Sequence, residues 1–228
     1  MNICVYREPF FHLVFKDFFT KSANKAILKE VVKNQRRFTE AGVGSQTKIR
    51  YNIRSNMVCY YDQTYRPKAT NCTPEQVSRA RQKSTLLREI DKKFKNEEFR
   101  EVLASSAYPI CDFGMTSTHE TQVSRYGHNQ KYGWHIDRLD NMSRVLTLIY
   151  YFFQEPSKWK GGELGLTDSP IYEGTTIEAS RETKINPQNN MAVVFGGHMA
   201  HCVFPTIEPK SLRFDEGRFS ANMWIGFK

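Results

Sequence analysis

Two histidines and one aspartate stand out because their types and spacing suit a metal site. His135 and Asp137 are separated by one residue, and His201 follows a predicted buried strand about sixty residues later. Two imidazoles and one carboxylate can hold a ferrous ion from one side, which leaves three coordination positions for a co-substrate and oxygen. The pattern therefore predicts an iron site, although His-x-Asp alone is a common pairing.

The local geometry of these ligands follows from a predicted extended backbone. In a strand, residues i and i+2 point to the same side, so His135 and Asp137 would converge if residues 132–137 are extended, with Ile136 turned into the core. Two histidines compete for the third position. His198 lies in the Gly196-Gly197 turn, whereas His201 opens a short apolar strand. We favour His201 and interpret His198 as a turn residue or one that supports the ligands.

An arginine on the last predicted strand could bind an anion beside this metal. If Arg218–Trp224 is extended, Arg218, Ser220, Asn222 and Trp224 share a polar face and the alternate residues form an apolar one. A guanidinium can hold a carboxylate through two parallel hydrogen bonds. A buried arginine also requires such a partner, because an unpaired buried charge is costly. The alternative is a salt bridge to Asp215 or Glu216 at the rim.

The elements that must position these residues differ between the two halves. Ser22–Arg37 is amphipathic and predicts a helix, and residues 49–61 predict one or two strands. Thr73-Pro-Glu-Gln76 matches a capping box with proline in the first turn, so a helix should begin there. It should continue, with or without a break, through Leu103.

After about residue 108 the pattern changes to period two. The predicted strands are 118–126, 132–136, 144–153, 163–167, 191–195, 202–204 and 214–227. Short strands in the second half and helices confined to the first predict a β-sandwich or open barrel buttressed by helices. The polar segment 169–190 predicts a loop with a short hairpin that could cover a site.

Composition favours one ordered domain without a disulfide framework. The 228 residues are 39% apolar and 13% aromatic, which suffices for a core. The five cysteines are odd in number, scattered and without a C-x-x-C pair, as expected in a reducing compartment. We see no signal peptide and no run of about 18 apolar residues. We therefore expect a cytoplasmic protein without a membrane partner.

The positive charge is concentrated away from the predicted metal site. The net charge is +9, and residues 1–110 carry 21 lysines and arginines against 11 acidic residues, whereas residues 111–228 carry 12 against 13. An acidic partner or nucleic acid is one interpretation. An ordinary solvated helical face is the more economical one, so we do not expect a nucleic-acid partner.

Five motifs together resemble one known family. They are Tyr126-x5-Tyr132-x2-His135-x-Asp137, Thr147-Leu-Ile-Tyr-Tyr151, Gly161-Gly-Glu-Leu164, His201-x-Val203-x-Pro205 and Arg218-x5-Trp224. This combination resembles the iron(II)/2-oxoglutarate-dependent dioxygenases of the prolyl 4-hydroxylase type, including the oxygen-sensing prolyl hydroxylases of animals and their bacterial relatives. The resemblance covers residues 120–227, and residues 1–110 match only in layout.

The resemblance implies an α+β, mainly β fold with a double-stranded β-helix (jelly-roll) core. It implies one dioxygenase domain over 1–228, with a helical and strand buttress in 1–110 and the core in 111–228. His135, Asp137 and His201 would bind iron. Arg218 would hold the distal carboxylate of 2-oxoglutarate with the Tyr151 hydroxyl, which must then face inward while Tyr150 faces away.

The same resemblance assigns the remaining pocket residues. Tyr126 and Tyr132 would lie near the metal and co-substrate, and Val203 and Trp224 would wall the pocket. Ordinary aromatic core is the alternative for the two tyrosines. One departure is the gap of 17 residues between His201 and the arginine, where the family usually has nine to twelve. The extra residues suit a longer hairpin loop, in which Arg213 could replace Arg218, but only Arg218 is followed by tryptophan six residues later.

The implied function is hydroxylation of an unactivated C–H bond. The cofactors would be Fe(II), 2-oxoglutarate and O2, with ascorbate as an optional supporting reductant, and succinate and CO2 would be released. A prolyl residue or proline-like group is the expected substrate, in a protein or peptide. A free amino acid or small natural-product precursor is the alternative, and the oligomeric state is left open. Because Asp137 keeps its carboxylate, halogenation is not expected.

Three other functions are weighed against this one. A zinc hydrolase accepts the same ligands but leaves Arg218, Tyr151 and Trp224 unexplained. A nucleic-acid demethylase of the same iron class usually has a second arginine where Trp224 stands. A non-catalytic module on the same barrel is disfavoured because all three ligand residues are present.

Overall fold

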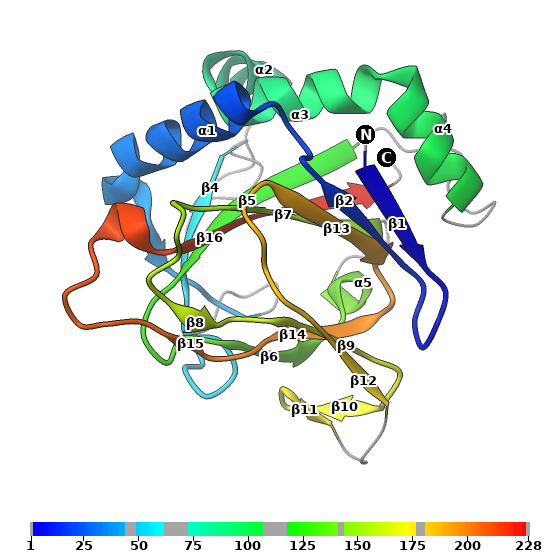
Figure 1. Ribbon diagram of the computed structural model, residues 1–228, viewed down its shortest axis with the longest axis vertical. Helices are drawn as coiled ribbons and strands as arrows, with labels where there is room; N and C mark the ends of the chain where they lie inside the picture. Colours follow the sequence, from blue (N-terminus) through cyan, green and yellow to red (C-terminus); the bar gives the residue numbers. More distant parts are fainter. Residues whose placement is uncertain are drawn as a thin grey trace.

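Two facing β-sheets form the body of the computed structural model, and helices cover one of them (Figure 1). The structure describes residues 2–43, 49–61, 73–106, 118–140, 144–176 and 181–226. In order across the main sheet, the strands are β1 (Asn2–Tyr6), β2 (His12–Lys16), β13 (Met191–Gly196), β7 (Arg144–Phe152), β16 (Arg218–Gly226), β5 (Thr118–Tyr126), β4 (Met57–Tyr60) and β3 (Thr39–Glu40). Every pairing in it is antiparallel.

The second sheet is smaller and also antiparallel. Its order is β12 (Glu182–Ile185), β9 (Leu164–Thr167), β14 (Ala200–Val203) and β6 (Tyr132–His135). Two short ribbons join it: β10 (Ile171–Tyr172) with β11 (Thr175–Thr176), and β8 (Lys160–Gly161) with β15 (Thr206–Ile207). Mainly β architecture with these two sheets confirms the predicted double-stranded β-helix core.

Helices form a layer on the outer face of the main sheet (Figure 1). They are α1 (Lys21–Lys33), α2 (Pro74–Lys83), α3 (Thr85–Lys95) and α4 (Glu97–Ser106), with a 3₁₀ turn at Gln35–Arg37. The capping box predicted at Thr73 is present, with the Thr73 hydroxyl accepting from the Gln76 N–H. The helix predicted to continue through Leu103 is interrupted at Ser84, whose hydroxyl caps the start of α3. No described helix is long and apolar enough to cross a membrane.

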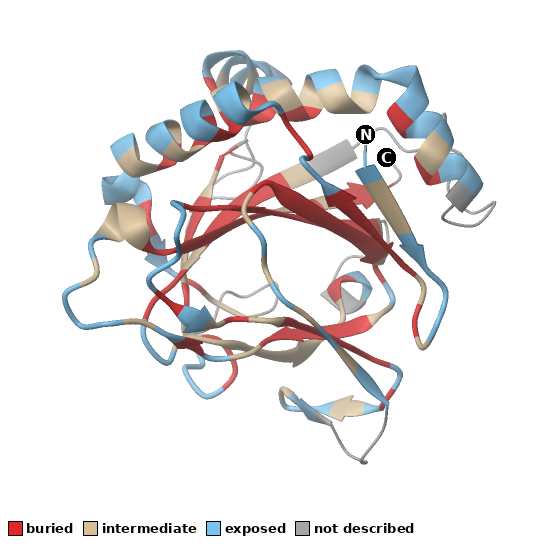
Figure 2. Ribbon diagram, viewed as in Figure 1, coloured by how far each residue is buried: buried red, intermediate tan, exposed pale blue. Residues whose placement is uncertain are grey.

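Strand alternation separates the packed face of the main sheet from the inner face. On β16, Phe219, Ala221, Met223 and Ile225 join the same buried cluster as Leu86 and Ile90 of α3. Burying a side chain of this size contributes about 1.5–3 kcal/mol. The alternate positions of β16 point between the two sheets. Figure 2 shows that the main sheet is buried where the helices cover it. This agrees with the apolar face predicted for the last strand.

Strands β1 and β2 were not predicted from the sequence. Strand β2 is bound on both sides, by β1 and β13, and four of its five residues are buried. A strand buried on both faces reads as a continuous apolar run and lacks the period of two. The first 110 residues therefore supply four strands of the main sheet in addition to the helical layer.

Several predicted boundaries were wrong. Asp137 does not lie on an extended strand: β6 ends at His135 and Asp137 begins α5 (Asp137–Asp140), a short helix in the half predicted to have none. Ile136 is only half-buried. The strand predicted over 214–227 begins at Arg218, after a 3₁₀ turn at Phe214–Glu216. Residues 49–61 yield one strand, β4, after a turn, with an isolated bridge at Arg54.

The polar segment 169–190 contains the expected hairpin, β10 with β11, together with β12. Residues 177–180 of this segment lie outside the described part, as do Cys72, Cys111 and Phe227. Cys4, Cys59 and Cys202 are free thiols. Of the predicted strands, 118–126 matches β5 at both ends.

One buried asparagine ties the N-terminal segment to the start of β13. The Asn190 side chain accepts from the Phe19 N–H at 3.0 Å and donates to the Phe19 carbonyl at 2.7 Å. Its backbone lies at φ 62°, a conformation that asparagine tolerates better than most residues.

We expect Asn190→Ala to lower the free energy of unfolding by about 3 kcal/mol, because two buried backbone groups lose their partners. Chemical denaturation measures the change. Asn129→Ala is the matched control, since Asn129 also has positive φ (57°) but is exposed. An equal loss in both variants would show that backbone conformation, and not the hydrogen bonds, accounts for the effect.

Candidate metal and co-substrate site

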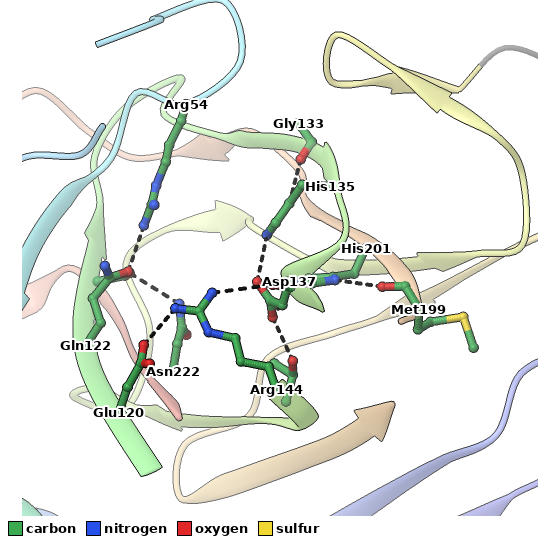
Figure 3. A network of polar contacts seen from close by, with 12 residues as sticks. Arg54, Glu120, Gln122, Gly133, His135, Asp137, Arg144, Met199, His201 and Asn222 are labelled. Atoms are coloured by element: carbon green, nitrogen blue, oxygen red, sulfur yellow. Dashed lines mark hydrogen bonds and ion pairs between the residues drawn. The ribbon is translucent and has the colours of Figure 1, made fainter. Parts of the chain in front are cut away.

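The structure brings His135, Asp137 and His201 together between the two sheets (Figure 3). One donor atom from each lies within 4.8 Å of the others. The His135 Nε2 is 3.7 Å from one carboxylate oxygen of Asp137, and the His201 Nε2 is 3.4 Å from the other. His198, the competing histidine, is exposed.

Strand pairing accounts for the convergence of the two histidines. Strands β6 and β14 are antiparallel neighbours, and His135 lies directly opposite His201 in their register. Directly opposed side chains on one face lie about 4.5–5.5 Å apart at Cβ. Asp137 reaches the same point from the first residue of α5, so a turn and not strand alternation completes the cluster.

The outer ring nitrogens of both histidines are already occupied. The Nδ1 of His135 lies 2.9 Å from the Gly133 carbonyl, and the Nδ1 of His201 lies 3.0 Å from the Met199 carbonyl. A carbonyl oxygen only accepts, so each Nδ1 must donate its hydrogen. In the neutral ring this leaves a lone pair on Nε2, which faces the carboxylate and is suited to a metal.

Charges and hydrogen bonds prepare the group for a cation. Burial lowers the pKa of His135 well below its usual value, and the neighbouring His201 lowers it further. The imidazole is therefore neutral at neutral pH, as a metal ligand must be. Burial alone would raise the pKa of Asp137, but the two histidines and the Thr147 hydroxyl, which donates at 2.6 Å, hold it below its usual value.

Arg218 lies at the opposite end of the same cavity, fully buried. Its Nε donates to the Gly162 carbonyl at 2.9 Å, whereas Nη1 and Nη2 have no hydrogen-bond partner among the described residues. The guanidinium lies 4.7 Å from the Tyr126 ring centroid and 5.2 Å from that of Tyr151. Two parallel unpaired donors are the geometry that a carboxylate accepts.

The alternatives for this arginine do not hold in the structure. Asp215 and Glu216 both pair with Arg213, whose side chain is 68% exposed, so Arg213 lies at the surface and Arg218 has neither acid as a partner. Gly162 permits the close approach of Arg218. Its φ is +70°, and a Cβ there would lie 2.6 Å from the arginine Cδ and Nε.

The predicted pocket residues are distributed as follows. The cavity that contains the three candidate metal ligands and Arg218 is also lined by Tyr126, Tyr132, Val203 and Trp224. Tyr151 is buried beside Arg218, and the guanidinium is the polar group that its hydroxyl faces. Tyr150 faces the helical layer, where its hydroxyl bonds Asn24. Burial raises the pKa of Tyr151 to about 12, so the hydroxyl remains a donor.

Three polar residues near the cavity were not singled out from the sequence. Thr147 bonds Asp137, as described above. Arg144 lies with its guanidinium 4.2 Å from the Trp224 ring and donates to Glu120 at 2.6 Å. Arg54 stacks on Tyr132. Of the three, only Thr147 could have been found from the sequence, because it shares a strand face with Tyr151. The two arginines come from segments that only the tertiary structure brings near the cavity.

Comparisons with known proteins agree with this geometry. Residues 121–226 match the family model described as the 2OG-Fe(II) oxygenase superfamily. A segment of 83 residues is 37% identical to an uncharacterized PKHD-type hydroxylase of Synechocystis sp., covering 36% of this chain and 27% of that protein. The chain thus spans about a quarter of that relative's length.

Solved structures share the fold at low sequence identity. A prolyl-4-hydroxylase of Pseudomonas putida aligns with TM-score 0.60 and 16% identity, over 94% of this chain and 92% of that one. A prolyl hydroxylase of Trichoplax adhaerens, in complex with a peptide fragment of the hypoxia inducible factor oxygen degradation domain, aligns with TM-score 0.63 and 16% identity, over 95% and 83%.

The chain therefore folds as a double-stranded β-helix of the kind found in prolyl hydroxylases. Residues 121–226, which hold all three candidate ligands and Arg218, match the model of the 2OG-Fe(II) oxygenase superfamily, a family that depends on Fe(II) and 2-oxoglutarate. The residues present suit both groups. Two imidazole Nε2 atoms with one carboxylate suit ferrous iron, and the Arg218 terminal nitrogens, unpaired among the described residues, suit a dicarboxylate.

We expect Thr147→Val to weaken Co(II) binding about tenfold, because an outer contact that orients a ligand carboxylate is lost. A spectroscopic titration of the metal-free protein measures the dissociation constant. Thr167→Val removes an equally buried hydroxyl that bonds the Arg181 carbonyl instead. The control should keep the wild-type metal affinity; equal weakening in both variants would contradict a specific role for Thr147.

Proposed function

We propose that this protein is an Fe(II)/2-oxoglutarate-dependent hydroxylase in which His135, Asp137 and His201 bind the iron and Arg218 binds the distal carboxylate of 2-oxoglutarate. One observation carries the proposal: the fully buried Arg218 has two unpaired donors in a cavity that also contains the three candidate ligands. A buried charge without a partner is costly, and an anionic co-substrate would offset that cost.

In this proposal, some groups bind the co-substrate and others orient the metal ligands. Iron with 2-oxoglutarate and O2, when bound, supplies the oxidising chemistry that releases succinate and CO2 and hydroxylates a C–H bond. Arg218 fixes the co-substrate through its parallel donors, and the Tyr151 hydroxyl adds a neutral donor. Val203 and the tyrosine rings keep water from the cavity. Thr147 and the Met199 and Gly133 carbonyls hold the ligands in orientation.

The proposed substrate is a prolyl residue of a peptide or protein. The shared fold with two prolyl hydroxylases supports this choice, one of them solved with a peptide bound. At the cavity, Trp224 offers an apolar ring for a pyrrolidine, and Arg144 beside it offers a donor for a peptide carbonyl. A free amino acid or a small natural-product precursor is the second candidate, because these contacts do not require a long chain.

Succinate release in the presence of Fe(II) and 2-oxoglutarate tests the reaction. We expect release to increase with prolyl peptides more than with free proline or other amino acids, and ascorbate to sustain turnover. Asp137→Ala should abolish turnover. No succinate with any substrate, from protein that binds metal, would contradict an oxygenase; metal-dependent hydrolysis in its place would favour a zinc hydrolase, and salt-sensitive binding of DNA or RNA would favour a demethylase.

We expect Arg218→Met to raise the KM for 2-oxoglutarate on the order of 100-fold, because two charge-assisted hydrogen bonds are lost. Arg218→Lys should recover part of this, since a lysine keeps the charge without the planar pair of donors. Arg213→Met, at the exposed arginine just before the turn that leads into β16, should leave the KM unchanged. An unchanged KM in Arg218→Met would remove the co-substrate assignment.

A further inference from the structure

A second buried arginine lies beside the candidate metal site and has no part in the function proposed so far. Arg54 precedes β4 in the first half of the chain and is 6% exposed. Each of its three nitrogens donates to a neutral oxygen: Nε to the Asn56 side chain at 2.9 Å, Nη1 to the Gly42 carbonyl at 3.2 Å and Nη2 to the Gln122 side chain at 2.7 Å. The structure therefore holds this cation in one orientation with neutral acceptors.

The guanidinium, the Tyr132 ring and the His135 imidazole form one stacked cluster. The Arg54 Cζ lies 4.3 Å from the centroid of the Tyr132 ring. The Tyr132 ring in turn lies 3.6 Å from the His135 imidazole and within 16° of parallel. The phenol ring is thus in contact with both a cation and the candidate ligand. An arginine over an aromatic ring contributes about 0.5–2 kcal/mol, with the larger value for desolvated pairs.

Backbone bonds fasten the stack to the second sheet. Arg54 and Tyr132 form an isolated antiparallel bridge. The Gly133 N–H donates to the Ile53 carbonyl at 2.7 Å, and the Ser55 N–H donates to the Lys131 carbonyl at 3.1 Å. Backbone hydrogen bonds therefore join the segment before β4 to β6, whose last residue is His135.

We propose that Arg54 is a positioning residue that fixes the His135 ring for metal binding by clamping Tyr132 against it. The inference rests on the proposed function in so far as His135 is a metal ligand. The Gly133 carbonyl fixes one ring nitrogen of His135, and the stack fixes the plane of the ring, so the two contacts together direct Nε2 toward Asp137. His201 has no comparable stack among the described residues and instead meets Phe195 at its edge.

The chemistry of this clamp requires arginine. A guanidinium is planar, so it can lie flat on a ring while its edge donates to several acceptors at once. A lysine would deliver one point charge and could not occupy all three acceptors in the same orientation. The clamp requires an aromatic ring at position 132, because the guanidinium and the imidazole both contact that ring, and neither of these two contacts involves the hydroxyl.

The test measures Co(II) affinity by absorbance titration of the metal-free protein, which does not depend on turnover. Arg54→Met should weaken Co(II) binding at least tenfold, as expected when an outer contact of a ligand is removed, and should change the cobalt absorption spectrum. Arg54→Lys should lie between Arg54→Met and wild type. The matched control is Arg125→Met, which removes another mostly buried arginine over an aromatic ring, that of Phe214, on the outer side of β5.

Two variants of Tyr132 keep the proposal falsifiable if Arg54→Met does not fold. Tyr132→Phe should keep the wild-type Co(II) affinity, whereas Tyr132→Leu should weaken it about as much as Arg54→Met. The double variant Arg54→Met/Tyr132→Leu should lose little beyond either single change, because both break one stack. Circular dichroism establishes that each protein is folded.

The outcomes separate this inference from the proposed function. If wild-type protein binds Co(II) and Tyr132→Leu or folded Arg54→Met binds it equally well, the clamp is refuted while the metal site stands. If Arg125→Met weakens binding as much as Arg54→Met, the effect is general destabilisation and the clamp is also refuted. If wild-type protein binds no Co(II), the metal site fails, and the inference fails with it.

Discussion

The constraint on which the rest of the structure depends is the burial of a guanidinium whose terminal nitrogens have no hydrogen-bond partner among the described residues. Each buried polar group without a hydrogen bond costs about 1–3 kcal/mol, so Arg218 reduces the stability of the protein unless an anion, such as the proposed co-substrate, is bound. The fold keeps the side chain in place in spite of this cost. Gly162 leaves room for it and accepts from its Nε, and the apolar face of β16 is anchored in the helical layer.

The second sheet supplies the two histidines of the candidate site, and strand pairing determines their position. Antiparallel pairing places His135 opposite His201, and two carbonyl oxygens orient the rings, that of Gly133 in β6 and that of Met199 just before β14. The first half of the chain contributes more than a covering layer. Strand β2 lies within the main sheet, and the segment before β4 reaches the candidate metal site through Arg54, which stacks on Tyr132. Both sheets and the N-terminal segment must therefore fold before the cavity is complete.

Features that depend on the local alternation of side chains and on residue type could be predicted from the sequence. Features that depend on tertiary contacts could not. The polar face of β16 followed from alternation, the inward direction of Tyr151 from the family resemblance, and the start of α2 from a capping box. Asp137 was placed on a strand because i, i+2 spacing suits one, yet a helix start also directs it to the cluster. Strand β2 shows no alternation of polar and apolar residues because both its faces are buried. Arg54 is about 80 residues away in the sequence from His135, so no local pattern relates the two.

The most direct test of the account is binding of 2-oxoglutarate to protein loaded with Mn(II), measured by calorimetry without oxygen chemistry. The account predicts one 2-oxoglutarate per chain, bound only when the metal is present, because metal and Arg218 would hold opposite ends of one molecule. Binding that is independent of the metal, or no binding by protein that retains one Mn(II) per chain, would contradict it.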